Sequence, residues 1–329
     1  MDPLTHTATG LFLSRAGLVR YTPCAPWILV LAANAPDIDA VAGFGGGLAY
    51  LEYHRHLTHA LAAAPVLALL PPLIVRLLCG KPLHWRSAYL LSLAAVLSHL
   101  ALDWTNMYGI RLLLPFSARW LRLDLTAVVD VWIWATFLLC IAGPLVARLV
   151  NLEIGARARP TGRGFAWLAL TFLVLYNCGR AVLHARALET LESRIYEGMA
   201  PARVAALPHP LNPFRWRGLV ETAGFYSIQE VNLLAEFDPT LGRTFYKPNS
   251  AAAIHAVENT AAFVNFQRFC QYPLWRTTPV PEPENGTRVE LLDLRFGAPG
   301  APGFRATAIL DSRLTVIRSW FEFGRLAPR

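Results

Sequence analysis

The sequence has little charge for its length. Asp, Glu, Lys and Arg make up 16% of its 329 residues, while hydrophobic residues make up 54%. Soluble globular domains carry about 25% charged residues. The mean hydropathy of +0.37 points the same way. These values argue against an ordinary soluble globule and place the chain in a membrane.

Several features of other protein classes are also missing. The five cysteines are an odd number without a C-x-x-C pair, which argues against a disulfide framework or a cysteine-based zinc knuckle. No run of five basic residues accompanies the net charge of +8, so we expect no nucleic-acid partner. Residues 1–10 lack the basic start of a cleaved signal peptide. A G-x-S-x-G elbow and a P-loop are absent, so serine-hydrolase and NTPase chemistry have no support.

Long apolar stretches are what the sequence does have. Four of them approach the ~20 residues that a helix needs to cross a hydrocarbon core of about 30 Å. They are 60–79, 87–104, 128–149 and 165–184. Two shorter stretches, 7–18 and 25–35, fit a helical hairpin packed against the spans. We therefore predict an all-α polytopic helical bundle of four spans with a short N-terminal hairpin.

The composition changes after residue 185, where prolines interrupt the chain and no further apolar run could span a membrane. Alternating patterns predict strands at 289–296, 305–310 and 314–323, and 251–269 could be a helix. The sequence thus predicts a membrane-embedded domain over 1–185 and a soluble α+β domain over 186–329.

Basic residues in the loops indicate the orientation, because Lys and Arg are enriched on the cytoplasmic side. Two loops that lie on one side of the predicted bundle carry Arg76, Lys81, Arg86, Arg148, Arg157, Arg159 and Arg163. The opposite, periplasmic side then receives the loops 37–59 and 103–126 and the C-terminal domain. Three arginines in the second of these loops, Arg111, Arg119 and Arg122, are a contrary signal.

The polar residues near the apolar stretches are mainly His and Asp, the ligand types that suit zinc, iron or manganese. They are His6, Asp37, Asp39, His54, His56, His59, His99, Asp103, Asp124 and Asp130. His99 and Asp103 are four residues apart, which puts them on one face of a helix. The loop charges bring three of the motifs to one membrane face. Ionisable groups at membrane depth are costly and point to a functional site, here a divalent-metal site. The alternative is a buried set of His–Asp hydrogen bonds, as in a proton relay.

A second row of polar residues lies on the last predicted span. Tyr176, Arg180 and His184 follow one another at intervals of four residues, and so share a helix face. Such a row could bind an anionic phosphate or carboxylate through the guanidinium. An interfacial belt of aromatic and basic residues would give the same pattern.

The motifs MDPLTHTATG, PDID, HRHLTH, HLALD and the pair Asp124 and Asp130 together resemble a known family. It is the family of bacterial inner-membrane, membrane-bound metal-dependent hydrolases, also described as LexA-binding membrane-associated hydrolases. The resemblance covers residues 1–185, and PHPLNPFRWRGLVET resembles the family's longer members. It implies metal-binding positions at His6, Asp37, Asp39, His54, His59, His99 and Asp103. Asp130 matches less closely, and His56 stands where the family has a small residue.

The family is distantly similar to zinc-dependent phospholipase C and P1-type nucleases, which implies phosphoester hydrolysis. The leading hypothesis is a hydrolase that uses zinc, or else manganese or magnesium, on a lipid or lipid-linked phosphoester in the inner membrane. Asp37 or Asp39 would be a bridging ligand or general base, and Arg55 or Arg180 would hold the anionic group. The competing hypothesis is a non-enzymatic scaffold, or a transporter of protons or metal ions.

Overall fold

The computed structural model describes residues 1–155 and 162–324. Arg157 and Arg159 lie outside the described residues. The contacts divide the chain into two compact units. We call them the helical unit (Met1–Asp39, Arg55–His184 and Pro208–Pro213) and the sheet unit (Ala40–His54, Ala185–Leu207 and Phe214–Arg329). Residues 40–54 therefore pack with the C-terminal part of the chain, although they lie within the predicted membrane domain.

The helical unit is built from helices of very different length. Its α-helices are α1 (Pro3–Arg15), α2 (Ala25–Asn34), α4 (Ala64–Leu67), α5 (Leu70–Cys79), α6 (Trp85–Thr105), α7 (Val131–Glu153) and α8 (Arg163–Glu192), which continues into the sheet unit. Short 3-10 helices are η1 (Leu18–Tyr21), η2 (Pro36–Gly45), which also continues into the sheet unit, and η3 (Leu57–His59).

Three helices among the described residues, α6, α7 and α8, are long and apolar enough to cross a membrane, or up to five spans if two bent helix pairs are each counted as one. Three of the four predicted spans are thus confirmed as continuous helices. The stretch 60–79 is not one helix, because it is divided into α4 and α5. Pro71 and Pro72 lie in the first turn of α5, where their missing N–H groups cannot bond back to α4, so the break comes just before them.

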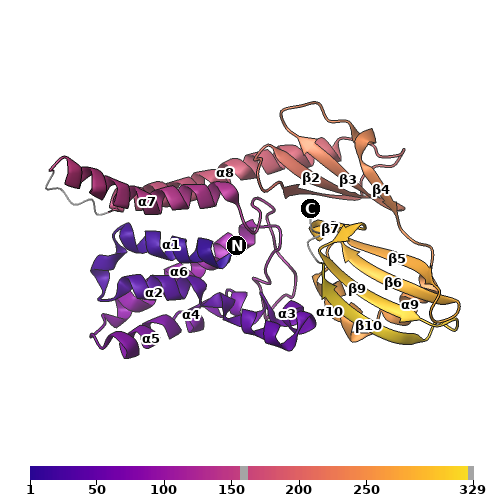
Figure 1. The fold of residues 1–329 in the computed structure, drawn as a ribbon, viewed down its shortest axis with the longest axis horizontal. Coiled ribbons are helices and arrows are strands. Elements are labelled where there is room, and N and C mark those ends of the chain that lie inside the picture. The colour runs from indigo at the N-terminus through magenta and orange to yellow at the C-terminus, as the bar shows by residue number, and fades with distance from the viewer. Residues whose placement is uncertain (156–161, 325–329) are drawn as a thin grey trace. The chain divides into compact units, whose positions relative to one another are not determined.

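The predicted N-terminal hairpin is confirmed: α1 and α2 pack side by side (Figure 1). Their approach depends on Gly10, since a Cβ at that position would lie 2.7 Å from the carbonyl oxygen of Leu29. The Asn34 side chain donates to the Thr7 hydroxyl at 3.0 Å and joins the open ends of the two helices. The Asp2 carboxylate caps α1 by accepting from the N–H groups of Leu4 and Thr5.

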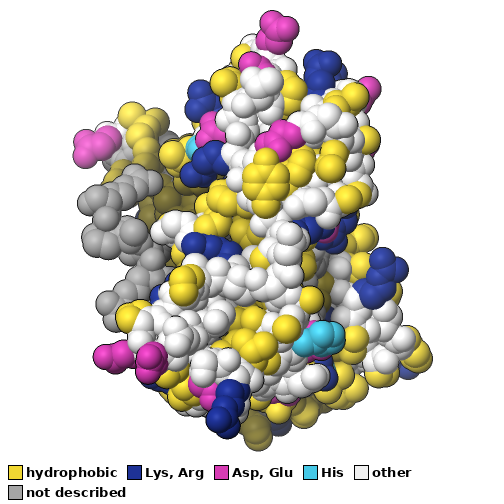
Figure 2. Space-filling model, turned by 90° about the vertical axis from the view of Figure 1, so that its right-hand side faces the viewer, with side chains coloured by type: hydrophobic (Ala, Val, Ile, Leu, Met, Phe, Trp, Pro, Cys, Tyr) yellow, Lys and Arg dark blue, Asp and Glu magenta, His cyan; other side chains and the backbone are white. Residues whose placement is uncertain are grey.

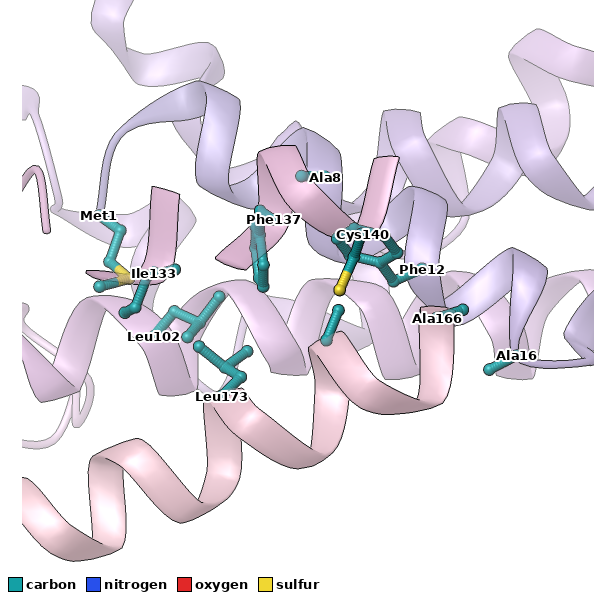
Figure 3. Close-up of a cluster of buried hydrophobic side chains, with 11 residues drawn as sticks. Met1, Ala8, Phe12, Ala16, Leu102, Ile133, Phe137, Cys140, Ala166 and Leu173 are labelled. Atoms are coloured by element: carbon teal, nitrogen blue, oxygen red, sulfur yellow. The ribbon is translucent and has the colours of Figure 1, made fainter. Parts of the chain in front are cut away.

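The face of α7 away from the bundle is apolar and exposed, as expected for contact with lipid. Leu138, Leu139 and Leu145 are 61–72% exposed on this helix. Its other face packs on α1, where the Phe12 and Phe137 rings meet edge to face at 5.0 Å (Figure 3). Apolar side chains on both faces are characteristic of a helix between lipid and a protein core.

The sheet unit contains two four-stranded sheets. The first has the order β1 (Arg203–Pro208), β2 (Arg215–Glu221), β3 (Phe225–Asn232), β4 (Arg243–Tyr246), and the second has the order β10 (Val316–Phe323), β9 (Phe304–Leu310), β6 (Gly286–Asp293), β5 (Pro273–Val280). All neighbours in the second sheet are antiparallel. A small pair, β7 (Gly297–Ala298) and β8 (Ala301–Pro302), lies between β6 and β9 in sequence. The remaining elements are α3 (Gly47–Tyr53), α9 (Ala251–Val257), α10 (Ala261–Phe269), η4 (Pro239–Leu241) and η5 (Leu294–Phe296).

The three predicted strands of this unit are confirmed by β6, β9 and β10, which supports the expected soluble α+β part. The single helix expected over 251–269 is instead two helices, α9 and α10. The buried Phe266 ring of α10 packs on the half-buried Phe321 ring of β10 at 5.2 Å, and α3 joins them through Tyr50, whose ring lies 5.8 Å from that of Phe323. On the face shown in Figure 2, Lys and Arg are interspersed with Asp and Glu, as on a surface in contact with water.

Candidate metal centre

The His and Asp residues of the helical unit meet at one end of its helices. His6 lies in the first turns of α1, Asp37 follows α2 on η2, and His99 and Asp103 lie near the end of α6. His59 comes from η3. The segments are up to about a hundred residues apart in sequence, but the side chains of His6, His59, His99 and Asp103 are all fully buried together. The antiparallel hairpin explains this arrangement, because it brings the start of α1 to the end of α2.

Four ligand atoms from these residues surround one point. The Nε2 atom of His59 lies 3.1 Å from Nε2 of His99, 3.2 Å from Asp103 Oδ2 and 3.4 Å from Asp37 Oδ1. The Nε2 atom of His99 lies 3.4 Å from the same Asp103 oxygen and 3.6 Å from the Asp37 oxygen. Ligand atoms held about 2.0–2.1 Å from a tetrahedral zinc ion lie about 3.3 Å from one another, so these spacings fit one small divalent ion.

The hydrogen bonds of His59 and His99 at Nδ1, the ring nitrogen that faces away from this point, also support a metal ion there. The Nδ1 atom of His99 lies 2.7 Å from the carbonyl oxygen of Ala33, which can only accept, so Nδ1 carries the proton. The Nδ1 atom of His59 lies 3.1 Å from Asp39 Oδ2 and donates to it in the same way. In the neutral rings both Nε2 atoms are then unprotonated and face each other. Asp103 Oδ2 has no hydrogen-bond partner among the described residues. A cation between these atoms would satisfy all of them.

His6 adds a further nitrogen ligand to this group. Its ring stacks on that of His99, with centroids 3.7 Å apart, and its Nε2 lies 3.4 Å from Asp103 Oδ1. Neither ring nitrogen forms a hydrogen bond to another described residue, although the side chain is fully buried. A buried imidazole without hydrogen bonds is costly, and a metal ligand is one arrangement that removes the cost.

Asp39 lies beside the cluster and holds His59. Its Oδ2 atom accepts from the Arg55 N–H at 2.9 Å, the Thr58 hydroxyl at 2.5 Å and Nδ1 of His59. Carboxylates in this position orient a ligating imidazole and increase its basicity. The structure thus gives Asp39 an orienting contact with His59, and its predicted role as a ligand or general base stays a prediction.

Arg55 is 3% exposed and extends into the same region. Its guanidinium donates to Asp103 Oδ1 at 3.0 Å and to the side chain of Asn106 at 3.3 Å, and it lies over the Tyr108 ring. The same Asp103 oxygen contacts the amine of Met1. Arg55 has φ of +56°, a backbone conformation that costs energy in a non-glycine residue and is concentrated at functional sites.

Asn106 and Tyr108 were missed by sequence reasoning. Asn106 follows Asp103 by three residues and donates to its Oδ1 at 3.3 Å, so the helical spacing was a usable signal. Tyr108 lies in an irregular loop, and no spacing predicts its position under Arg55. His54 belongs to the sheet unit, where its ring stacks on Tyr50 at 4.4 Å, and its role as a metal ligand stays a prediction. His56 is half-buried.

The second row of predicted residues lies elsewhere in the helical unit. The Asp130 carboxylate caps α7 and accepts from the Tyr176 hydroxyl at 3.1 Å. Arg180 is buried and donates to the carbonyl oxygens of Leu125, at 2.8 Å, and Pro213. Such contacts fasten loops to α8. Binding of an anionic substrate by Arg180, His184, Tyr176 or Asp130 stays a prediction. Asp124 pairs with Arg122 in the preceding loop.

Comparisons with known proteins agree with the membrane assignment. The chain is 27% identical over 335 aligned positions to a Bacillus subtilis (strain 168) protein named Uncharacterized protein YfhP, and the match covers 97% of this chain and 94% of that protein. No solved structure matches the chain. A sequence model of the YdjM inner membrane protein family matches residues 1–187. Since this match covers more than half of the sequence and includes every residue of the buried His/Asp cluster, the chain belongs to the YdjM inner membrane protein family.

Proposed function

We propose that this protein is a membrane-bound metal-dependent hydrolase, with zinc as its ion and a phosphoester of a lipid or lipid-linked molecule as its substrate. The observation that carries the proposal is the 3.1 Å approach of the Nε2 atoms of His59 and His99 beside two carboxylate oxygens. Two imidazoles and two carboxylates are a ligand set that suits zinc, with manganese and magnesium as alternatives.

The residues of the cluster divide into holding and positioning groups. Asp37, His59, His99 and Asp103 would hold the ion, and His6 is placed to join them. His54 is retained as a predicted further ligand. An ion at this place supplies a Lewis acid that polarises an ester and acidifies water. Asp37 is 17% exposed whereas the other three are fully buried, so it is the carboxylate at the accessible side, where a general base must act.

Arg55 supplies positive charge next to the ligands. Its guanidinium neutralises Asp103 in the buried site and lies close to where an anionic group of a substrate would enter. We infer that it orients Asp103 in the resting protein and stabilises negative charge that develops on a phosphoester. The guanidinium of Arg55 can bind either the Asp103 carboxylate or a substrate phosphate, because its planar N–H groups match two oxygens of either group.

We further propose that the site faces the periplasm. Arg76 lies in the last turn of α5, Lys81 in the loop that follows, and Arg86 in the first turn of α6, at the end of α6 away from His99 and Asp103. Lys and Arg are enriched on the cytoplasmic side of membrane proteins. If the site and the C-terminal domain face the periplasm, a reporter enzyme that works only outside the cytoplasm should be active when fused after residue 329. Activity of a reporter that works only in the cytoplasm, fused at the same position, would overturn this orientation.

Elemental analysis of the purified full-length protein tests the metal assignment. We expect close to one zinc ion per chain or more, with His99→Ala and Asp103→Ala losing most of it. The control is His255→Ala, since His255 is an exposed histidine of the sheet unit. Metal-loaded protein should then hydrolyse members of a phosphoester panel. Stoichiometric metal missing from the wild type would overturn the metal site, and metal without any turnover would overturn the hydrolase.

The alternative is a transporter or proton relay, and the chain of contacts from His99 through His59 to Asp39 is the observation in its favour. Such hydrogen-bonded His–Asp chains are used for proton transfer in membrane proteins. Reconstituted liposomes distinguish the two functions. Movement of zinc or protons across the bilayer that is lost in His59→Ala, without hydrolysis, would favour the transporter.

A further inference from the structure

A groove of about 220 Å³ lies between α1 and α7. Its lining includes Leu4, Thr5 and Ala8 of α1 and Trp134, Phe137 and Ile141 of α7. Nearly all of this lining is apolar. The groove is separate from the hydrogen-bonded His/Asp cluster, since the cluster's His6 does not line it.

The groove is continuous with the apolar face of α7. Leu138 lines the groove and is also 61% exposed on the face that we assign to lipid. This depression is poorly suited to ordered water, because the polar groups of Thr5, Thr7 and Trp134 that line it are already hydrogen-bonded within the protein. If the depression were empty, the atoms that line it would lack dispersion contacts on one side. Hydrocarbon chains of the bilayer can supply these contacts, so we expect one of them to fill it.

Polar groups close one end of the groove. The Trp134 indole N–H donates to the Asp2 carboxylate at 3.0 Å, and the Thr5 hydroxyl donates to the same carboxylate at 2.6 Å. This end adjoins the metal cluster through α1 itself, because Thr5 and His6 are consecutive and point about 100° apart around the helix. A chain in the groove would therefore have its polar end beside the cluster.

We propose that this groove binds one acyl chain of a bilayer lipid and presents the lipid's ester end to the His/Asp cluster. The inference rests on the proposed function and narrows its substrate to a lipid carrying an acyl chain. It places substrate entry at the α1–α7 side of the helical unit. Thr5 and Trp134 then act as positioning residues that set the depth of the chain.

Photolabelling tests the groove without any need for turnover. The full-length protein is reconstituted in vesicles that contain phosphatidylglycerol with a diazirine on one acyl chain, and labelled peptides are mapped by mass spectrometry. We expect label on Phe137 and Thr5, which are 3% and 2% exposed and out of reach of lipid that merely surrounds the protein. Leu139 and Leu145 face lipid directly and report that background.

A variant that fills the groove provides the decisive comparison. Ala8→Phe should lower the label on Phe137 and Thr5 about tenfold, a difference of ~1.4 kcal/mol in occupancy, while label on Leu145 stays unchanged. Leu139→Phe adds a ring on α7 outside the groove and should change nothing. Should Ala8→Phe fold poorly, Ile141→Trp narrows the groove from the other helix. Absence of label at Phe137 and Thr5, or label that both groove variants leave unchanged, would overturn the proposal.

Two further measurements separate this inference from the proposed function. Zinc content should be equal in Ala8→Phe and wild type, because the cluster is untouched. A water-soluble phosphodiester without an acyl chain should be hydrolysed equally by both, whereas a long-chain lipid substrate should be hydrolysed less by the variant. Labelling of the groove without any hydrolysis would support the acyl-chain site and contradict the proposed hydrolase activity. Hydrolysis without labelling of the groove would support the hydrolase activity and contradict the acyl-chain site.

Discussion

His59 and His99 bring their Nε2 atoms to 3.1 Å while each ring donates from Nδ1 to a separate acceptor, Asp39 in one case and the Ala33 carbonyl in the other. Each ring is thus held from behind by a fixed acceptor. Ala33 lies on α2, which packs against α6, and Asp39 lies on η2, while η3 positions His59 itself. The cluster therefore depends on its surrounding contacts as much as on its ligand residues.

The Asp39 contact predicts a graded effect on zinc affinity. Asp39→Asn keeps the size of the side chain but removes the charge that fixes the His59 tautomer, and we expect zinc affinity to fall about 10–100-fold. Thr58→Val removes only one of the three hydrogen bonds to Asp39 and is expected to cost less. Chelator competition on the purified protein measures both. Equal affinities for wild type and Asp39→Asn would show that Asp39 has no orienting role.

The buried Arg55–Asp103 pair predicts a loss of stability when the guanidinium is removed. Arg55→Met leaves the Met1 amine as the remaining cationic partner of Asp103 and should lower the free energy of unfolding by about 3 kcal/mol, because a buried carboxylate that loses a partner is costly. Denaturation in mixed micelles measures the change. Arg119→Met, at an exposed arginine of the following loop, is the control. A similar loss in both variants would remove the special role of Arg55.

Helix packing at Gly10 gives a prediction independent of metal. A Cβ there would lie 2.7 Å from the Leu29 carbonyl oxygen, so Gly10→Val should force α1 and α2 apart and lower stability by about 1–3 kcal/mol. Gly164→Ala on α8 meets no atom within 4 Å and should be neutral or mildly stabilising, since alanine favours helix. Thermal unfolding in detergent compares them. Unchanged stability in Gly10→Val would contradict the close packing.

Much of the helical unit was predictable from apolar runs and from His–Asp spacing. The pair His99 and Asp103 is an example, because residues four apart on a helix share a face whatever the rest of the fold does. Where the sequence failed, the cause was non-local. The spacing of Asp37 and Asp39 gave no sign that Asp39 accepts from Nδ1 of His59, since this contact depends on where His59 lies. Likewise, the packing of α3 against Phe323 joins residues more than 270 positions apart.

The first sheet of the sheet unit carries a charge network that predicts a pH dependence. Burial alone would raise the pKa of the Glu221 carboxyl, but hydrogen bonds from Lys247 and Tyr226, both at 2.9 Å, outweigh burial and lower this pKa below its ordinary value of 4.5. A carboxyl with a lowered folded-state pKa stabilises the fold at pH above 4.5 and loses that contribution as the pH falls through the folded-state value.

Glu221→Gln should therefore weaken the β2–β3–β4 sheet at neutral pH and converge with wild type in acid. The amide of glutamine still accepts from Tyr226, but it no longer attracts the charged Lys247. Hydrogen exchange of the β2 and β3 amides in the full-length protein is the measurement, because it reports this sheet alone. Faster exchange in the variant at pH 7, with the difference vanishing well below pH 4.5, is the expected result. A difference that is the same at every pH would mean that Glu221 contributes through packing and not through its charge.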